Sequence, residues 1–124
     1  MSNSIKLSTL PHTWILDIDG TILRHNGYLD DSEEILDGVS SFFNSIPDSD
    51  MIIFLTARDE KYRGDTENFL SENNIRFDAI FFGVPVGERI LVNDSKISGL
   101  KCAHAINLER DAFDMPLVEI DESL

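Results

Sequence analysis

The sequence predicts an α/β fold: a doubly wound, Rossmann-like, mainly parallel sheet of about five strands, with helices on both faces and no cap domain. Short apolar runs alternate with longer amphipathic segments between residues 13 and 112, which is typical of strand–helix–strand units. Polar side chains follow three of these runs, at what would be the carboxyl ends of parallel strands. The segments that connect the strands are shorter than the roughly 50 residues of an independent domain, so none of them can fold into a domain that covers the site. We therefore expect the site to be open.

Each predicted element depends on its local pattern. Short apolar runs predict strands at 13–18, 51–55, 79–82, 89–92 and 103–106. The first of them is almost wholly apolar, as expected for a strand buried on both faces. A first helix is predicted from about Glu33 to Ile46, because apolar residues recur at helical spacing after Asp30, Asp31 and Ser32, which can cap it. A second helix is predicted at 60–73, with a weaker apolar stripe.

Composition limits the function. The chain has 124 residues and a formal net charge of −13, which argues against nucleic acid or an anionic membrane as a partner. No stretch reaches the roughly 20 apolar residues needed to span a bilayer, and Met1–Leu10 does not read as a signal peptide. The single cysteine, Cys102, excludes an intramolecular disulfide, favours a cytoplasmic location and is expected to be a small buried side chain.

The segment most informative about chemistry is Asp17-Ile18-Asp19-Gly20-Thr21, directly after an apolar strand. Residues i and i+2 of a strand face the same side, so Asp17 and Asp19 should point into one small volume. Two close carboxylates repel unless a cation separates them, and Mg²⁺ is the cation that prefers such oxygen ligands. The alternative is a turn followed by a helix cap, since Asp and Gly both favour turns.

Two later strands end in comparable chemistry. Thr56 follows the second predicted strand and Asp94 follows the fourth. Because ligands bind outside the carboxyl ends of parallel strands, we expect these side chains to meet Asp17 and Asp19 on one rim of the sheet.

These residues resemble the haloacid dehalogenase superfamily of phosphotransferases. Its first motif, D-x-D-G-T after a buried strand, is matched at residues 17–21, its second by Thr56 and its fourth by Asp94, and the resemblance covers about residues 13 to 110. A narrower similarity, at 83–96 and 105–110, is to small capless bacterial members linked to sugar-phosphate, capsule and lipopolysaccharide pathways. The resemblance implies a catalytic domain at 13–112, between an N-terminal extension at 1–12 and an acidic C-terminal tail at 113–124 that we expect to be frayed.

The resemblance also implies roles for individual residues. Asp17 would be the nucleophile and Asp19 the general acid and base, and both would bind Mg²⁺ together with Asp94 and the Ile18 carbonyl. Thr56 and the adjacent Ala57 would hold the phosphoryl group.

The cation of the family's third motif has no clear counterpart. Arg89 would lie roughly 15 Å from Asp94, at the wrong end of a strand. Lys96 and Arg58 follow strand ends instead, so we expect these two side chains to bind the phosphate.

The predicted function is a Mg²⁺-dependent phosphomonoesterase that acts through an aspartyl-phosphate on a sugar phosphate or a similar small phosphorylated metabolite. A neighbouring subunit of a homo-oligomer could close the open site. One alternative is a non-catalytic phosphosugar-binding module, because the third motif is missing. A receiver-type signalling domain is the other, although no aspartate follows the second or third predicted strand where its phosphoacceptor would lie.

Overall fold

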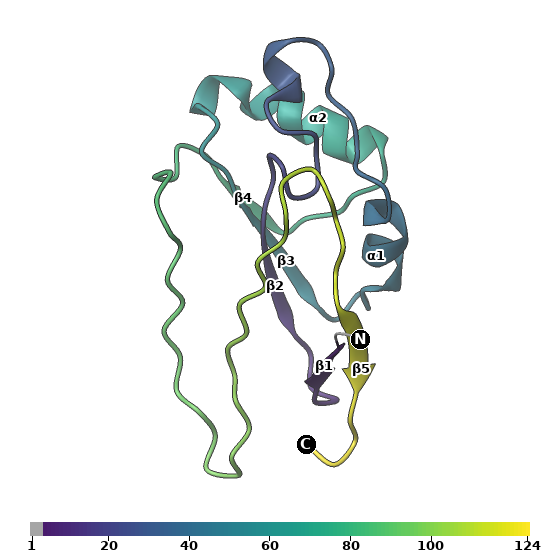
Figure 1. The fold of residues 1–124 in the computed structure, drawn as a ribbon, viewed down its shortest axis with the longest axis vertical. Coiled ribbons are helices and arrows are strands. Elements are labelled where there is room, and N and C mark those ends of the chain that lie inside the picture. Colours follow the sequence, from purple (N-terminus) through teal and green to yellow (C-terminus); the bar gives the residue numbers. More distant parts are fainter. Residues whose placement is uncertain (1–3) are drawn as a thin grey trace. The chain divides into compact units, whose positions relative to one another are not determined.

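The computed structural model describes residues 4–124 as an α/β chain with parallel strands in two separate sheets (Figure 1). The chain divides into two compact units. The first takes in the described residues up to Leu10 with Val86–Asn107 and Met115–Leu124, and the second comprises Pro11–Pro85 and Leu108–Asp114. The expected single sheet of about five strands is therefore corrected to one sheet of three strands and one of two.

The second unit contains the three-stranded sheet, in the order β2 (Thr13–Asp17), β3 (Met51–Leu55) and β4 (Ala79–Phe81). All three strands run parallel, as predicted. Asp17 lies opposite Leu55, and Leu55 lies opposite Phe81. The register therefore brings the carboxyl ends of the three strands to one edge of the sheet.

Helical segments connect these strands. They are η1 (Gly27–Leu29), α1 (Val39–Ser45), η2 (Glu60–Tyr62) and α2 (Arg63–Glu72). Asp59 caps η2 by accepting the Lys61 backbone N–H. One apolar cluster joins strands and helices, and its buried members are Leu16, Ile18, Ile22, Leu23, Val39, Phe43, Ile46, Ile52, Phe54, Leu70, Ile75 and Ile80.

The first helix is shorter than its apolar pattern predicts. Residues 33–38 are not helical, and α1 begins only at Val39 after Gly38, whose φ is 88°. Backbone hydrogen bonds instead join this stretch to residues after β2, from Leu36 to the Ile22 carbonyl and from Arg24 to the Glu34 carbonyl. The non-local backbone pairing replaces the first turns of the predicted helix.

The first unit contains the two-stranded parallel sheet of β1 (Ser4–Leu7) and β5 (Leu117–Ile120). The acidic tail, expected to be frayed, therefore contains a strand that pairs residue by residue with β1. Residues 1–3 of the predicted N-terminal extension lie outside the described residues.

The segment Val86–Asn107 corrects two predicted strands. Neither 89–92 nor 103–106 forms a strand, and the only bridge within the segment is the antiparallel one between Ser95 and Lys101. Val86, Ile90 and Val92 are 85–90% exposed, and Cys102, expected to be buried, is exposed. An apolar run forms a strand only where a neighbouring strand pairs with it, and no strand pairs with 89–92 or with 103–106.

Across residues 4–124, no helix combines the length and apolar character that a transmembrane span requires.

A buried aspartate fastens the start of β2 to the start of β3. Asp50 is 5% exposed, and its carboxylate accepts the His12 backbone N–H and the Trp14 indole N–H, both at 3.0 Å. Burial acts to raise the pKa of Asp50, but these hydrogen bonds outweigh it, so the pKa lies below its ordinary value of 3.8. The ionised carboxylate therefore stabilises the folded state.

We expect Asp50→Asn to lower the free energy of unfolding by about 2 kcal/mol at neutral pH, because hydrogen bonds to a charged group are lost. Because the pKa of Asp50 is lower in the folded protein than in the unfolded chain, ionised Asp50 stabilises the fold fully at pH values above its ordinary pKa. This stabilisation is lost as the pH falls through the lowered, folded-state pKa. Urea denaturation at a series of pH values should show the gap between parent and variant closing in acid. Exposed Asp48→Asn is the matched control, and a gap that stays constant down to about pH 2 would contradict the linkage.

Candidate functional site

The D-x-D-G-T segment forms a tight turn directly after β2. The buried Ile18 carbonyl accepts the backbone N–H groups of Thr21, Ile22 and Leu23 at 3.0–3.2 Å. Gly20 has a φ of 80°, a left-handed conformation that glycine adopts without strain. This turn leaves the side chains of Asp17 and Asp19 half-buried beyond the carboxyl end of β2.

The neighbouring strand supplies Thr56, which is fully buried. Its backbone N–H donates to the Phe81 carbonyl at 2.9 Å, and its side-chain oxygen accepts the Arg58 backbone N–H at 3.1 Å. Ala57 lies exposed between them. The structure thus places five of the predicted site residues in the second unit, at or just beyond the ends of β2 and β3: Asp17, Asp19, Thr56, Ala57 and Arg58.

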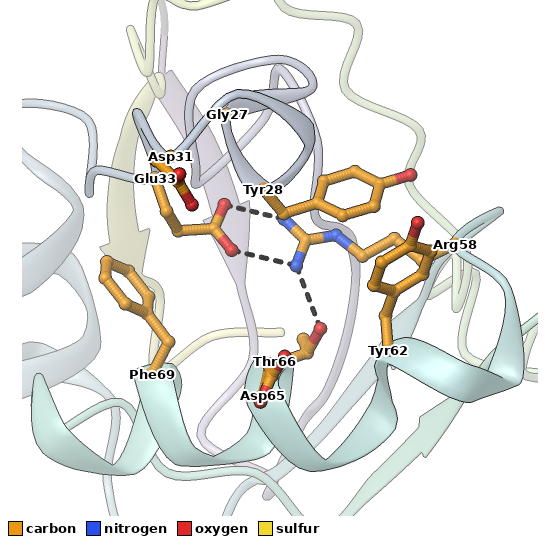
Figure 2. Close-up of a pocket in the computed structure, with 9 residues that line it drawn as sticks. All are labelled: Gly27, Tyr28, Asp31, Glu33, Arg58, Tyr62, Asp65, Thr66 and Phe69. Atoms are coloured by element: carbon orange, nitrogen blue, oxygen red, sulfur yellow. Dashed lines mark hydrogen bonds and ion pairs between the residues drawn. The ribbon is translucent and has the colours of Figure 1, made fainter.

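Arg58 is 2% exposed, and all five of its guanidinium N–H groups have acceptors. Nε and Nη2 donate to the two oxygens of Asp19 at 3.0 and 2.9 Å. Nη1 and Nη2 donate to the two oxygens of Glu33 at 3.0 and 2.8 Å, and Nη1 also donates to the Thr66 hydroxyl at 2.9 Å (Figure 2). The guanidinium is thus a three-way link between the motif turn, the loop that follows η1 and helix α2.

The same contacts determine the charge state of Arg58. Burial acts to lower its pKa, but the hydrogen bonds and charges of Asp19 and Glu33 raise it above its ordinary value. The Tyr28 ring covers the guanidinium at 4.0 Å. Because every donor is engaged, Arg58 could bind a phosphate, as predicted, only after releasing one of these partners.

Beside this cation lies a pocket of about 310 Å³. Figure 2 shows the guanidinium among the lining side chains, with Glu33 to its left and Thr66 of α2 below it. Two tyrosines, Tyr28 and Tyr62, meet edge to face with ring centroids 4.8 Å apart. The complete lining consists of Gly27, Tyr28, Asp31, Glu33, Arg58, Tyr62, Asp65, Thr66 and Phe69.

The two remaining predicted residues, Asp94 and Lys96, belong to the first unit, and both are exposed. The Asn93 side-chain amide donates to the Asp94 backbone carbonyl at 3.0 Å. Lys96 begins a tight turn, in which its N–H donates to the Leu100 carbonyl at 2.9 Å and its own carbonyl accepts the Gly99 N–H at 2.8 Å. Their roles at the metal and the phosphate stay predictions.

The donor set bears on the predicted metal. Among residues 4–124, no group of three or more His, Cys, Asp or Glu side chains is arranged to hold a metal ion. The Ile18 carbonyl, implied as a ligand, is buried and already accepts three N–H groups, so that implied role is corrected. Asp17 and Asp19 offer carboxylate oxygens, and Mg²⁺ is often held by one or two carboxylates and several waters. Both Asp19 oxygens already accept N–H groups of Arg58, so Mg²⁺ binding by this pair stays a prediction.

Sequence reasoning missed the partners of Arg58. The sequence pattern predicts Glu33 in the first turn of one helix and Thr66 within another, and they lie 25 and 8 residues from Arg58 in the chain. It also missed Arg110. A Cβ added to Gly20 would lie 3.1 Å from the Arg110 Cγ, so this basic side chain passes directly beside the motif turn. Nothing in the local pattern around Arg110 signals that proximity.

Comparisons with protein-family models, with curated proteins and with solved structures found no match to this chain.

Proposed function

We propose that this protein is a Mg²⁺-dependent phosphomonoesterase of the haloacid dehalogenase type, without a cap domain, acting on a sugar phosphate or a similar small phosphorylated metabolite. The observation that carries the proposal is the position of the D-x-D-G-T turn at the carboxyl end of β2. Buried Thr56 lies at the carboxyl end of the neighbouring strand, β3. Parallel pairing of β2, β3 and β4 supports the Rossmann-like character of the fold, whose ligands bind at that edge.

The proposed reaction uses two carboxylates, Asp17 as the nucleophile and Asp19 for proton transfer. An oxygen of Asp17 would attack phosphorus, and the bond from phosphorus to the substrate oxygen would break. That oxygen would take the proton of Asp19, which has to enter this step protonated, and Asp17 would be left as the aspartyl-phosphate. Asp19 then takes a proton from water as the water attacks phosphorus, which releases phosphate and restores Asp17. Each Asp19 oxygen accepts from Arg58 and retains a further lone pair for proton transfer, so Arg58 acts as a positioning residue for Asp19.

Positive charge at the phosphoryl group is the other requirement, because phosphoryl transfer depends on positioning and charge stabilisation. Mg²⁺ held by Asp17 and Asp19, with Asp94 as a further proposed ligand, would supply part of that charge. Lys96 is a proposed phosphate-binding residue, and Arg110 joins it because its side chain passes beside Gly20. The proposal includes a cytoplasmic location, supported by the single cysteine, Cys102.

A second candidate function is a non-catalytic phosphosugar-binding module. It is favoured by one observation: all five donors of Arg58, a predicted phosphate-binding residue, are taken up by protein acceptors. Such a module would bind phosphorylated ligands without turnover.

The test is hydrolysis of p-nitrophenyl phosphate with Mg²⁺ or with EDTA. We expect turnover only with Mg²⁺, and a higher Tm at millimolar Mg²⁺, because a ligand at a hundred times its Kd stabilises the native state by about 2.7 kcal/mol. Ca²⁺ at equal concentration is the control for general screening of the acidic chain. A Tm that Mg²⁺ leaves unchanged would exclude the metal site, and a Mg²⁺-dependent Tm without turnover would favour the binding module.

A further inference from the structure

We propose that the pocket between η1 and α2 binds a small organic cation, such as a substituted ammonium ion. The pocket is distinct from the Asp17 and Asp19 carboxylates, neither of which lines it. The proposal stands independently of the proposed phosphatase activity. It rests on a cavity with aromatic walls, an excess of carboxylates and a guanidinium that has no free donor.

Aromatic rings supply the walls. Tyr28 and Tyr62 are half-buried and in contact, and Phe69 of α2 lies across the guanidinium from them in Figure 2. Both tyrosines already lie under cations of the chain, since Arg58 stacks on Tyr28 at 4.0 Å and the Lys61 ammonium lies 5.2 Å from the Tyr62 centroid. Rings of this kind attract ammonium ions whose charge is surrounded by apolar groups.

Charge determines the class of ligand. Three carboxylates line the pocket, from Asp31, Glu33 and Asp65, against the single guanidinium of Arg58. Arg58 shares its charge between Glu33 and Asp19 and has no N–H left to donate. Among the lining residues an anion would therefore meet carboxylates and no free guanidinium donor, whereas a cation would meet several carboxylate acceptors.

The pKa of Tyr28 is raised above its ordinary value. Its pKa is raised by burial first and then by the negative charge of Asp19, with Glu33 adding to the effect and Arg58 opposing it. The volume of about 310 Å³ is at the lower end of small-molecule pockets, which suits a compact cation.

The experiment compares choline with its uncharged isostere, 3,3-dimethylbutan-1-ol, in titrations of the full chain followed by NMR. We expect choline to saturate with a Kd on the order of 1 mM, and the isostere to bind about tenfold more weakly, the effect expected when a cation–π contact is lost. Tyr62→Leu should weaken choline binding about tenfold, whereas Tyr62→Phe should retain it because the ring remains.

Asp65→Asn tests the charge of the pocket, and Glu72→Gln, exposed at the end of the same helix and outside the lining, is its matched control. We expect about a threefold loss for the first change and none for the second. Three outcomes would overturn the proposal. They are isostere binding as tight as that of choline, comparable binding of a neutral polyol such as glucose, and an equal loss of choline affinity in the Asp65 and Glu72 variants. An absence of saturation at about fifty times the expected Kd would overturn it as well.

Discussion

Replacement of Arg58 by methionine is expected to lower the free energy of unfolding by about 3–5 kcal/mol, the scale seen when one member of a buried charge network is removed. The Arg58 side chain is 1% exposed, while those of Asp19 and Glu33 are each 16% exposed. Methionine fills a similar volume but leaves the Asp19 and Glu33 carboxylates without the cation that both of them bind. Thermal unfolding followed by circular dichroism should show a fall in Tm of roughly 10–15 °C.

Arg58→Lys should fall between the parent and the methionine variant, because lysine retains the charge but cannot fill five acceptor positions at once. Arg24→Met removes an exposed guanidinium from the same unit and controls for the change in net charge. An Arg58→Met protein that melts within about 3 °C of the parent would show that the network contributes little to stability.

Asp17→Asn is expected to abolish phosphatase turnover while the protein remains folded, if the proposed function is right. The amide is a poor nucleophile, yet it keeps the shape of the side chain and can still accept the Thr21 hydroxyl, which donates to Asp17 Oδ2 at 3.1 Å. The measurement is p-nitrophenyl phosphate hydrolysis beside a thermal melt. A second measurement, acid quenching with ³²P-labelled substrate, should trap label on the parent protein and none on the variant.

Asp37→Asn, an exposed aspartate in the same unit, is the matched control and should leave turnover unchanged. Full activity in Asp17→Asn would exclude a covalent mechanism through this residue. Label trapped equally on both proteins would assign the intermediate to another side chain.

Much of the second unit could be predicted from local sequence. The strands β2, β3 and β4 fall within their predicted ranges, and the predicted helix at 60–73 corresponds to η2 followed by α2. These elements follow from runs of apolar residues and helical spacing, which neighbouring residues determine. The position of Asp17 and Asp19 beyond the carboxyl end of β2 follows from the same local pattern, while the convergence of their side chains stays a prediction.

The elements that local patterns could not predict depend on distant partners. Residues 33–36 have a helical pattern, but they pair with the chain after β2, and Glu33 binds a guanidinium 25 residues away. Strand β5 lies in an acidic tail whose partner, β1, is at the other end of the chain. The apolar run at 89–92 has strand propensity, but no strand pairs with it in this structure. Propensity indicates what a segment can form, whereas pairing determines what it does form.

The second unit is built from two stretches that are separated in the chain by Val86–Asn107. The later stretch is short, but its contacts lie at the motif turn: the Asp111 N–H donates to the Gly20 carbonyl at 2.8 Å, and the Asp111 carboxylate accepts the His25 N–H at 2.7 Å. Phe113 packs edge to face against Phe42, with centroids 5.3 Å apart. A fragment that stopped at Pro85 would contain all three strands and still lack the residues that hold this turn. Truncation of the chain at Pro85 would therefore separate the D-x-D-G-T turn from the residues that contact it. A minimal fragment of the second unit has to contain both Pro11–Pro85 and Leu108–Asp114.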